Sequence, residues 1–315
     1  MIAFHSSRPY IQPMQPSETA RDATAPPRTW TVLSLLEWAS SYLSERRFDE
    51  PRLHVELLLA SILKIGRLDL YLQFDRPLLP QELTAFKTLF KRRLTHEPLQ
   101  YILGETEFMG LRFTVNSGVL IPRPETELLV EKSLDVISRL GNRPVSVADI
   151  GTGSGNIAIA IAHFAPVTTV TALDVSPDAL ATAGVNCKRN QVSNVHLEQA
   201  DIFADVFGTR TFDLILANPP YISVEEFGKL QEEIRVHEPR VATTDEGDGY
   251  RFIRRISSIA ALHLKPGGFL MMEIGFGQAD MSRGIAGESG LTVETVYPDF
   301  NRIPRVLAAR RPGEV

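Results

Sequence analysis

The sequence predicts an α/β protein whose doubly wound parallel sheet ends in an antiparallel hairpin and follows a small helical bundle. Strand-like apolar runs alternate with helical stretches between residues 145 and 274, as in parallel strands joined by crossover helices. A glycine-rich loop follows the first run and opens a helix. Residues 30–97 instead carry apolar side chains at spacings of three and four, which is typical of packed helices.

At 315 residues, the chain is long enough for about two domains. We expect a disordered extension over 1–29, a helical domain over 30–97, a linker with a β-hairpin over 98–122 and the sheet domain over 123–315. The extension is rich in proline and small residues and lacks the apolar core of a signal peptide.

Three helices are expected in the helical domain. The first begins near Trp30, and the second begins at Pro51 and ends near Gly66. The third begins near Pro80 and has basic side chains on its solvent-facing side. This basic face is interpreted as a solvated surface, and the alternative is that it docks a partner. The predicted apolar faces are Leu35, Leu36, Ala39, Tyr42 and Leu43, then Leu57, Leu58, Ser61, Ile62 and Leu63, then Leu83, Phe86, Phe90 and Leu94. The basic side chains are Lys87, Lys91, Arg92 and Arg93.

Short β-like segments between Phe108 and Val119 predict a hairpin with its turn at Asn116-Ser117-Gly118. The parallel strands are expected at Val145–Ile150, Thr168–Asp174, Val195–Gln199, Phe212–Ala217 and 269–274. The terminal hairpin is expected at 291–297 and 306–309.

Composition excludes several classes of function. A net charge of −5 and a pI near 5.9 argue against general binding to nucleic acid, which rests on clustered lysine and arginine. The one cysteine, Cys187, cannot form an internal disulfide, and no Cys/His spacing resembles a zinc site. No apolar run is long enough to span a membrane. We therefore expect a cytoplasmic protein with no metal and no membrane partner.

The glycine loop Gly151-Thr152-Gly153-Ser154-Gly155 follows the first strand and opens a helix over 156–163. Glycines let the backbone pass close to a bound nucleoside, and the helix N-terminus adds free N–H donors. A dinucleotide site would need a third glycine at position 156, which is Asn156. With Asp149 just before it, the loop suits S-adenosylmethionine, which has no pyrophosphate and carries an ammonium group.

Acidic residues follow the next two strands. Asp174 is placed to accept from both ribose hydroxyls; its alternative role is a helix N-cap, for which Ser176 competes. Asp201 is placed to accept from the adenine amino group, with Ile202 over the ring. The alternative for Asp201 is an aspartate that only stabilises a turn.

Asn218-Pro219-Pro220-Tyr221 follows the buried strand Phe212–Ala217 and suits chemistry on a nitrogen. An amide nitrogen is a poor nucleophile, so an enzyme that alkylates it must hold both hydrogens with fixed acceptors. The Asn218 side-chain oxygen and the Pro219 carbonyl supply such acceptors, and the prolines hold them rigid. Tyr221 adds a flat face for a planar group. The alternative is a Pro-Pro turn that ends a strand.

Together these residues resemble a class I S-adenosylmethionine-dependent methyltransferase with its Rossmann-like fold. More narrowly, they resemble the HemK/PrmC family, which methylates the glutamine side chain of peptide chain release factors. The resemblance covers about residues 30–311 and rests on the strings 100–104, 121–127 and 218–221 and on Phe108. Departures from the family pattern occur at Ile202, at 243–246 and at 302–305.

The resemblance implies methylation of the side-chain amide nitrogen (N5) of the glutamine in the Gly-Gly-Gln motif of class I release factors. It implies that the cofactor, which leaves as S-adenosylhomocysteine, is bound by Gly151, Thr152, Gly153, Ser154, Gly155, Asp174, Asp201, Ile202 and Asn218. The acceptor glutamine would be bound by Asn218, Pro219, Pro220 and Tyr221, with Asn218, Pro219 and Tyr221 catalytic and Phe108 walling the pocket. Thr126 and Glu127 lie in a segment similar to the family's cofactor lid. The helical bundle resembles the family's substrate-recognition domain.

Three other functions use similar features. An adenine-N6 or cytosine-N4 nucleic-acid methyltransferase can grip an exocyclic amine with the same tetrapeptide, but it must also grip phosphates. The acidic balance of the chain favours a protein substrate instead. A nonenzymatic ligand sensor has little use for the tetrapeptide, and Asn156 argues against an NAD-dependent dehydrogenase.

Overall fold

The computed structural model describes residues 29–313, so all but the last residue of the predicted extension lies outside the described residues. The chain divides into two compact units, Met1–Thr84 and Ala85–Val315. Helix α3 (Pro80–Arg93) contains the division between them.

The first unit contains α1 (Val32–Ser44), α2 (Pro51–Leu63) and the 3-10 helix η1 (Arg67–Leu72). Thr31 caps α1, since its side chain accepts from the Ser34 backbone N–H. The predicted face of α1 is confirmed except at Tyr42, which is only partly buried.

Two predictions for α2 are wrong. The helix ends at Leu63, before Gly66, because Lys64 adopts the left-handed conformation at φ 55° and closes the last turn. The buried face is also displaced: Ser61 is exposed, while the Glu56 carboxylate is buried with Arg52, Arg67 and Tyr71 bonded to it. A charge is tolerated in that interior because it is paired.

The second unit begins within α3, where the predicted wet face is wrong at one position. Arg93 is 1% exposed, and its guanidinium pairs with Glu233, 140 residues further on. After α4 (Leu99–Leu103), the hairpin strands are β1 (Glu105–Phe108) and β2 (Leu111–Thr114).

The hairpin turn is Met109-Gly110, where both residues have positive φ, and not Asn116-Ser117-Gly118 as predicted. Asn116 stabilises a separate turn, with its side-chain oxygen accepting from the Gly118 N–H at 2.8 Å.

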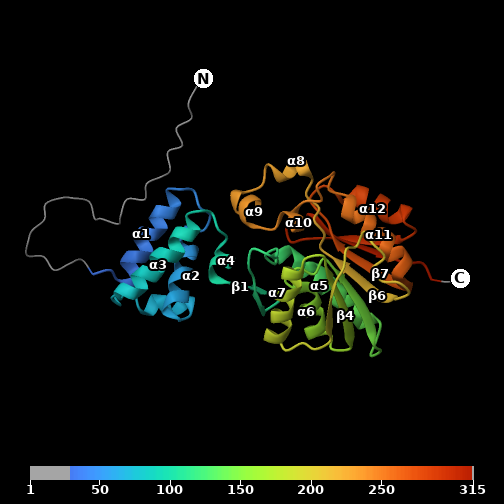
Figure 1. Ribbon diagram of the computed structural model, residues 1–315, viewed down its shortest axis with the longest axis horizontal. Helices are drawn as coiled ribbons and strands as arrows, with labels where there is room; N and C mark the ends of the chain where they lie inside the picture. Colours follow the sequence, from blue (N-terminus) through green and yellow to red (C-terminus); the bar gives the residue numbers. More distant parts are fainter. Residues whose placement is uncertain (1–28, 314–315) are drawn as a thin grey trace, which may run out of the picture. The chain divides into compact units, whose positions relative to one another are not determined.

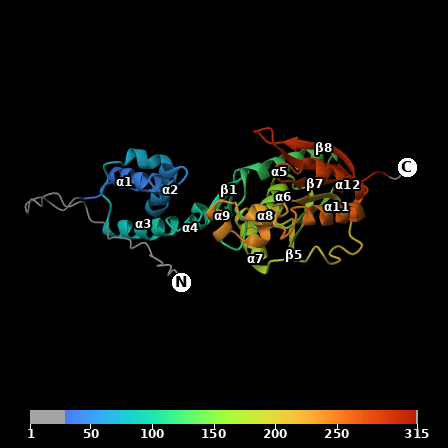
Figure 2. The ribbon, with the colours of Figure 1, turned by 90° about the horizontal axis from the view of Figure 1, so that it is seen from above.

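A seven-stranded sheet forms the centre of the second unit, in the order β5-β4-β3-β6-β7-β9-β8. Its strands are β3 (Val145–Ile150), β4 (Thr168–Asp174), β5 (Val195–Gln199), β6 (Phe212–Ala217), β7 (Leu264–Glu273), β8 (Thr292–Pro298) and β9 (Pro304–Arg310). The predicted fold is confirmed, with β9 antiparallel to both β7 and β8; β7 begins five residues before its predicted start. Figure 2 shows β5 and β8 on opposite sides of this unit.

Helices cover both faces of the sheet (Figure 1). On one side lie α5 (Pro124–Arg139), α6 (Asn156–Phe164) and α7 (Pro177–Arg189); on the other lie α11 (Arg251–His263) and α12 (Ala279–Glu288). Alternate residues of each strand enter separate cores: Leu214 and Leu216 pack with α5 and α6, whereas Ile215 and Ala217 pack with α11 and α12. Burial of each large apolar side chain stabilises the fold by about 1.5–3 kcal/mol.

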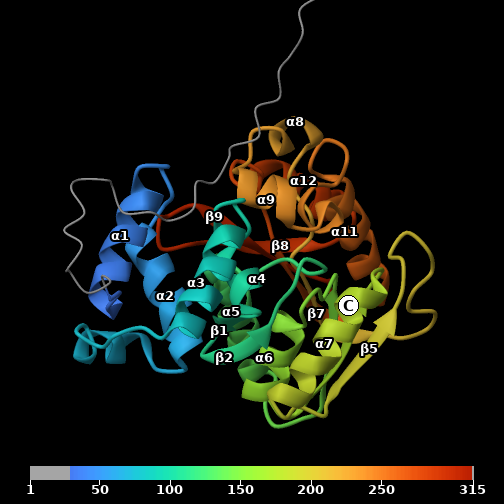
Figure 3. The same ribbon diagram turned by 60° about the vertical axis from the view of Figure 1, so that its left-hand side comes forward.

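The strand order reverses beside β3, because β4 lies on one side of it and β6 on the other. Ligands of open α/β sheets bind outside the carboxyl ends of the strands at such a point. Three short helices follow β6 near this edge, α8 (Val224–Phe227), α9 (Glu232–His237) and α10 (Arg240–Thr243), with α8 and α9 close together in Figures 1 and 3.

Candidate active site

The glycines of the loop after β3 serve two different purposes. Gly151 and Gly153 have φ of 74° and 55°, and a Cβ added to either would meet no atom within 4 Å. A Cβ added to Gly155, at φ 83°, would lie 2.9 Å from the Ile159 side chain and 3.1 Å from that of Ala183. The first two glycines therefore leave space open above the loop, and the third allows α6 to pack.

A buried acid lies directly behind the loop. Asp149 is fully buried, and its Oδ2 accepts from the Thr152 hydroxyl at 2.7 Å. Its Oδ1 has no hydrogen-bond partner within the described residues. Burial raises the pKa of this carboxyl to about 7.

A cavity of about 280 Å³ opens beside the loop and brings most of the predicted site residues together. Among its lining residues are Gly151, Gly153, Asp174, Asp201, Ile202, Asn218, Pro219 and Pro220. They come from the carboxyl ends of β3, β4, β5 and β6, which lie side by side in the sheet.

The two acids of the cavity have backbone partners. Asp174 accepts from the Gly153 and Ser176 N–H groups, both at 2.9 Å, and each oxygen retains a further lone pair. Ser176 is the N-cap of α7, so Asp174 is not. Asp201 accepts from the Phe203 N–H at 2.9 Å, so it stabilises a turn and also lines the cavity.

Several cavity residues were not predicted from the sequence. Pro239, Val241, Ala242, Arg251 and Phe252 also line the cavity. The Arg251 guanidinium lies 4.4 Å from the centre of the Phe203 ring. No local pattern marks these residues, since they reach the cavity only through the packing of α10 and α11.

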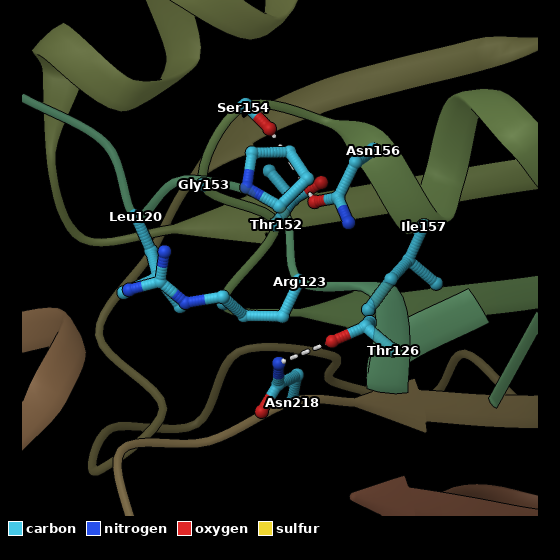
Figure 4. Close-up of a pocket in the computed structure, with 11 residues that line it drawn as sticks. Leu120, Arg123, Thr126, Thr152, Gly153, Ser154, Asn156, Ile157 and Asn218 are labelled. Carbon is cyan, nitrogen blue, oxygen red and sulfur yellow. Dashed lines mark hydrogen bonds between the residues drawn. The ribbon is translucent and has the colours of Figure 1, made fainter. Parts of the chain in front are cut away.

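A smaller pocket adjoins the glycine loop where Asn218 meets the start of α5 (Figure 4). Arg123, Thr126, Thr152 and Asn218 are among its lining residues. Asn218 Nδ2 donates to Thr126 Oγ1 at 3.1 Å, and the Thr126 hydroxyl lies 2.7 Å from Glu273 Oε2. The side-chain oxygen of Asn218 points away from Thr126 in Figure 4.

Tyr221 and Phe108 do not line either pocket in the described part of the chain. The Tyr221 hydroxyl donates to Glu273 Oε1 at 3.1 Å, and burial together with the Glu273 charge raises the pKa of Tyr221. Phe108 is 1% exposed and packs edge-to-face on Phe113 with centroids 6.1 Å apart. Their predicted contacts with the acceptor glutamine stay predictions.

Glu127, in the predicted lid, accepts from the Met109 N–H at 2.6 Å.

The two segments that depart from the family pattern are anchored locally. Thr244 pairs with Ile222, Asp245 accepts from the Gly247 and Arg251 N–H groups, and Arg305 pairs with Asp299 at 3.1 Å.

Over residues 29–313, no group of three or more His, Cys, Asp or Glu side chains is arranged to hold a metal ion. In the same residues, none of the helices is both long and apolar enough to cross a membrane.

Two family models match the chain. Residues 34–104 match the PrmC N-terminal domain, and residues 126–238 match the methyltransferase small domain. The release factor glutamine methyltransferase of Geobacter sulfurreducens is 42% identical over 287 residues, covering 91% of this chain and 99% of that protein. Those of Chlorobaculum tepidum and Rhodopirellula baltica are 41% and 39% identical over 290 and 277 residues, covering 89% and 87% of this chain and 97% and 92% of those proteins.

Proposed function

Because the chain belongs to the release factor glutamine methyltransferase family, we propose that it methylates the N5 amide nitrogen of the glutamine in the Gly-Gly-Gln motif of class I peptide chain release factors. It is thus a protein-(glutamine-N5) methyltransferase of the cytoplasm. The observation that carries this proposal is the position of Asn218, at the end of β6 and beside the glycine loop.

In our proposal the cofactor is S-adenosylmethionine, held by residues that line the larger cavity and by the adjoining glycine loop. Gly151, Thr152, Gly153, Ser154 and Gly155 pass beneath it, Asp174 accepts from the ribose hydroxyls, and Asp201, Ile202 and Asn218 complete its contacts. The open space above Gly151 and Gly153, which both line the larger cavity, supports this assignment. When bound, the cofactor supplies an electrophilic methyl group on a sulfonium and leaves as S-adenosylhomocysteine.

Asn218 and Pro219 would orient the acceptor amide. The Asn218 Oδ1 atom and the Pro219 carbonyl accept the two hydrogens of the glutamine nitrogen, so its lone pair is aimed for in-line attack on the methyl carbon. Such positioning is worth up to ~7–11 kcal/mol in favourable systems. The acceptors also stabilise positive charge that develops on the amide hydrogens. Methylation makes that nitrogen acidic, so its proton leaves to water and no strong base is needed.

The helical segment over 30–97 is proposed to recognise the release factor, as a domain separate from the catalytic domain over 123–315. The match of residues 34–104 to the PrmC N-terminal domain supports this division. No contact with nucleic acid or with a membrane is part of the proposal.

Incubation with tritiated S-adenosylmethionine tests the substrate class. We expect label in a purified class I release factor and none in DNA; label in DNA alone would instead establish the nucleic-acid methyltransferase. The substitution Asn218→Ala tests the site. It should retain most of the cofactor binding by calorimetry, because the other cofactor contacts remain, while abolishing methyl transfer. Turnover near the wild-type rate would refute the role of Asn218.

A further inference from the structure

Glu273 is a buried acid at the carboxyl end of β7, next to the strand that carries Asn218. It is 2% exposed, and both of its oxygens accept from hydroxyl groups. Oε2 lies 2.7 Å from Thr126 Oγ1, and Oε1 lies 3.1 Å from the Tyr221 hydroxyl. A buried carboxylate needs such donors. Of the two hydroxyls, that of Thr126 lines the smaller pocket beside Asn218.

The contact with Glu273 decides which way the Asn218 amide faces. A hydroxyl group has one proton, and Thr126 gives its proton to Glu273. Toward Asn218, at 3.1 Å, the Thr126 oxygen can therefore act only as an acceptor. Of the two atoms at the end of the Asn218 side chain, only Nδ2 can donate. The oxygen Oδ1 must then point the opposite way, as in Figure 4.

We propose that Glu273 is a positioning residue, which acts through Thr126 to hold Asn218 with Oδ1 directed at the hydrogens of the acceptor nitrogen. This inference rests on the proposed function. In the reverse orientation, the Nδ2 hydrogens of Asn218 would face the hydrogens of the substrate amide, and one of the two acceptors would be lost. Glu273 touches neither substrate nor cofactor in this arrangement.

The direction of the chain of hydrogen bonds depends on the charge of Glu273. A protonated Glu273 could donate to Thr126, which would then be free to donate to Asn218 and favour the reverse orientation. The groups around the carboxyl are the Thr126 and Tyr221 hydroxyls, Arg305 and Glu125. Burial and Glu125 raise the pKa of Glu273, while the hydroxyls and Arg305 lower it.

The test compares steady-state methylation of a class I release factor by the wild type and five variants at saturating cofactor. Thr126→Val removes the hydroxyl and keeps the shape, and Thr126→Ser keeps the hydroxyl. Thr168→Val is the matched control, because Thr168 is 2% exposed, lies at the amino end of β4 and donates its hydroxyl to the Ala165 carbonyl. We expect Thr126→Val to lower kcat about 10- to 100-fold, by analogy with the loss of outer hydrogen-bond partners at metal sites. The cofactor KM should stay close to that of the wild type.

Thr126→Ser should recover most of the lost rate, and Thr168→Val should keep the wild-type kcat. Glu273→Gln presents a single acceptor oxygen to two hydroxyls, so it should lower kcat. In the wild type, protonation of Glu273 should lower kcat at acid pH, and this part of the pH dependence of kcat should be absent from Glu273→Gln. The double variant T126V/E273Q should lose no more than T126V alone, since both changes interrupt one chain.

The inference is overturned if Thr126→Val retains the wild-type kcat, or if the two losses multiply in the double variant. An inactive wild-type enzyme would instead overturn the proposed function itself, and the two failures are thus distinguishable.

Discussion

Gly249 packs closely against the backbone of the Asn218-Pro219-Pro220-Tyr221 segment, and Gly249→Ala tests whether this close packing holds the segment in place. Gly249 has φ 85°, and a Cβ added there would lie 2.7 Å from the Tyr221 carbonyl oxygen and 2.9 Å from Gln278 Nε2. The same Nε2 donates to the Tyr221 carbonyl at 2.9 Å. The new methyl group would therefore push on the backbone of the tetrapeptide and on its hydrogen bond.

Two costs add for this substitution. A left-handed backbone costs a residue with a Cβ about 1–2 kcal/mol, and loss of one hydrogen bond costs about 0.5–1.5 kcal/mol. We expect Gly249→Ala to lower the free energy of unfolding by about 2–3 kcal/mol. Gly141→Ala is the matched control, because Gly141 has φ 74° and a Cβ there would meet nothing within 4 Å. Gly141→Ala should lower the free energy of unfolding only by the cost of the left-handed backbone.

Urea unfolding followed by circular dichroism measures both costs, and methylation of a release factor measures the effect on the site. Gly249→Ala should unfold at lower urea than Gly141→Ala and should lose kcat, while Gly141→Ala should keep it. Equal stability of the two variants, with normal kcat in both, would show that the tetrapeptide is not held by this close contact.

Three further predictions concern single side chains. Asp213 is 3% exposed and accepts from Arg143, Lys265 and Ser146, which hold the pKa of its carboxyl below the ordinary value. Asp213 therefore stabilises the fold fully at pH values above its pKa in the unfolded chain, and this stabilisation is lost as the pH falls through its lower pKa in the folded protein. In urea unfolding at pH 7, Asp213→Asn should lower the free energy of unfolding by about 3 kcal/mol. It should also make that free energy less dependent on pH in the acid range. Asp174→Asn should weaken S-adenosylmethionine binding about tenfold or more by calorimetry, because charged acceptors make the stronger hydrogen bonds, and an unchanged Kd would exclude the ribose contact. Lys64→Gly should raise the free energy of unfolding by about 0.5–1 kcal/mol through relief of its left-handed backbone, and a loss of stability would contradict that assignment.

The strands of the sheet were predictable because parallel strands are buried on both faces. Every residue of β6 is buried, which produces the unbroken apolar run that marks it in the sequence. The residues that follow such strands gather at one edge of the sheet. For this reason Gly151, Asp174 and Asn218 could be assigned to one site from their order along the chain.

The sequence could not reveal contacts between distant segments. Arg93 has the appearance of a surface residue until Glu233 is brought beside it. Glu273 is the last residue of a strand, and its partner Thr126 precedes it by 147 residues. The hydrogen bond from the Tyr221 hydroxyl to Glu273 also joins segments that are far apart in the sequence. The orientation of these side chains depends on packing that local spacing does not determine.

Mass spectrometry of the release factor peptide that contains Gly-Gly-Gln, after incubation with this enzyme and S-adenosylmethionine, tests the proposed reaction most directly. We predict one added methyl group on the amide nitrogen of that glutamine with the wild-type enzyme, and an unmodified peptide with Asn218→Ala. An unmodified peptide with the wild type, or a methyl group on another residue, would contradict the account.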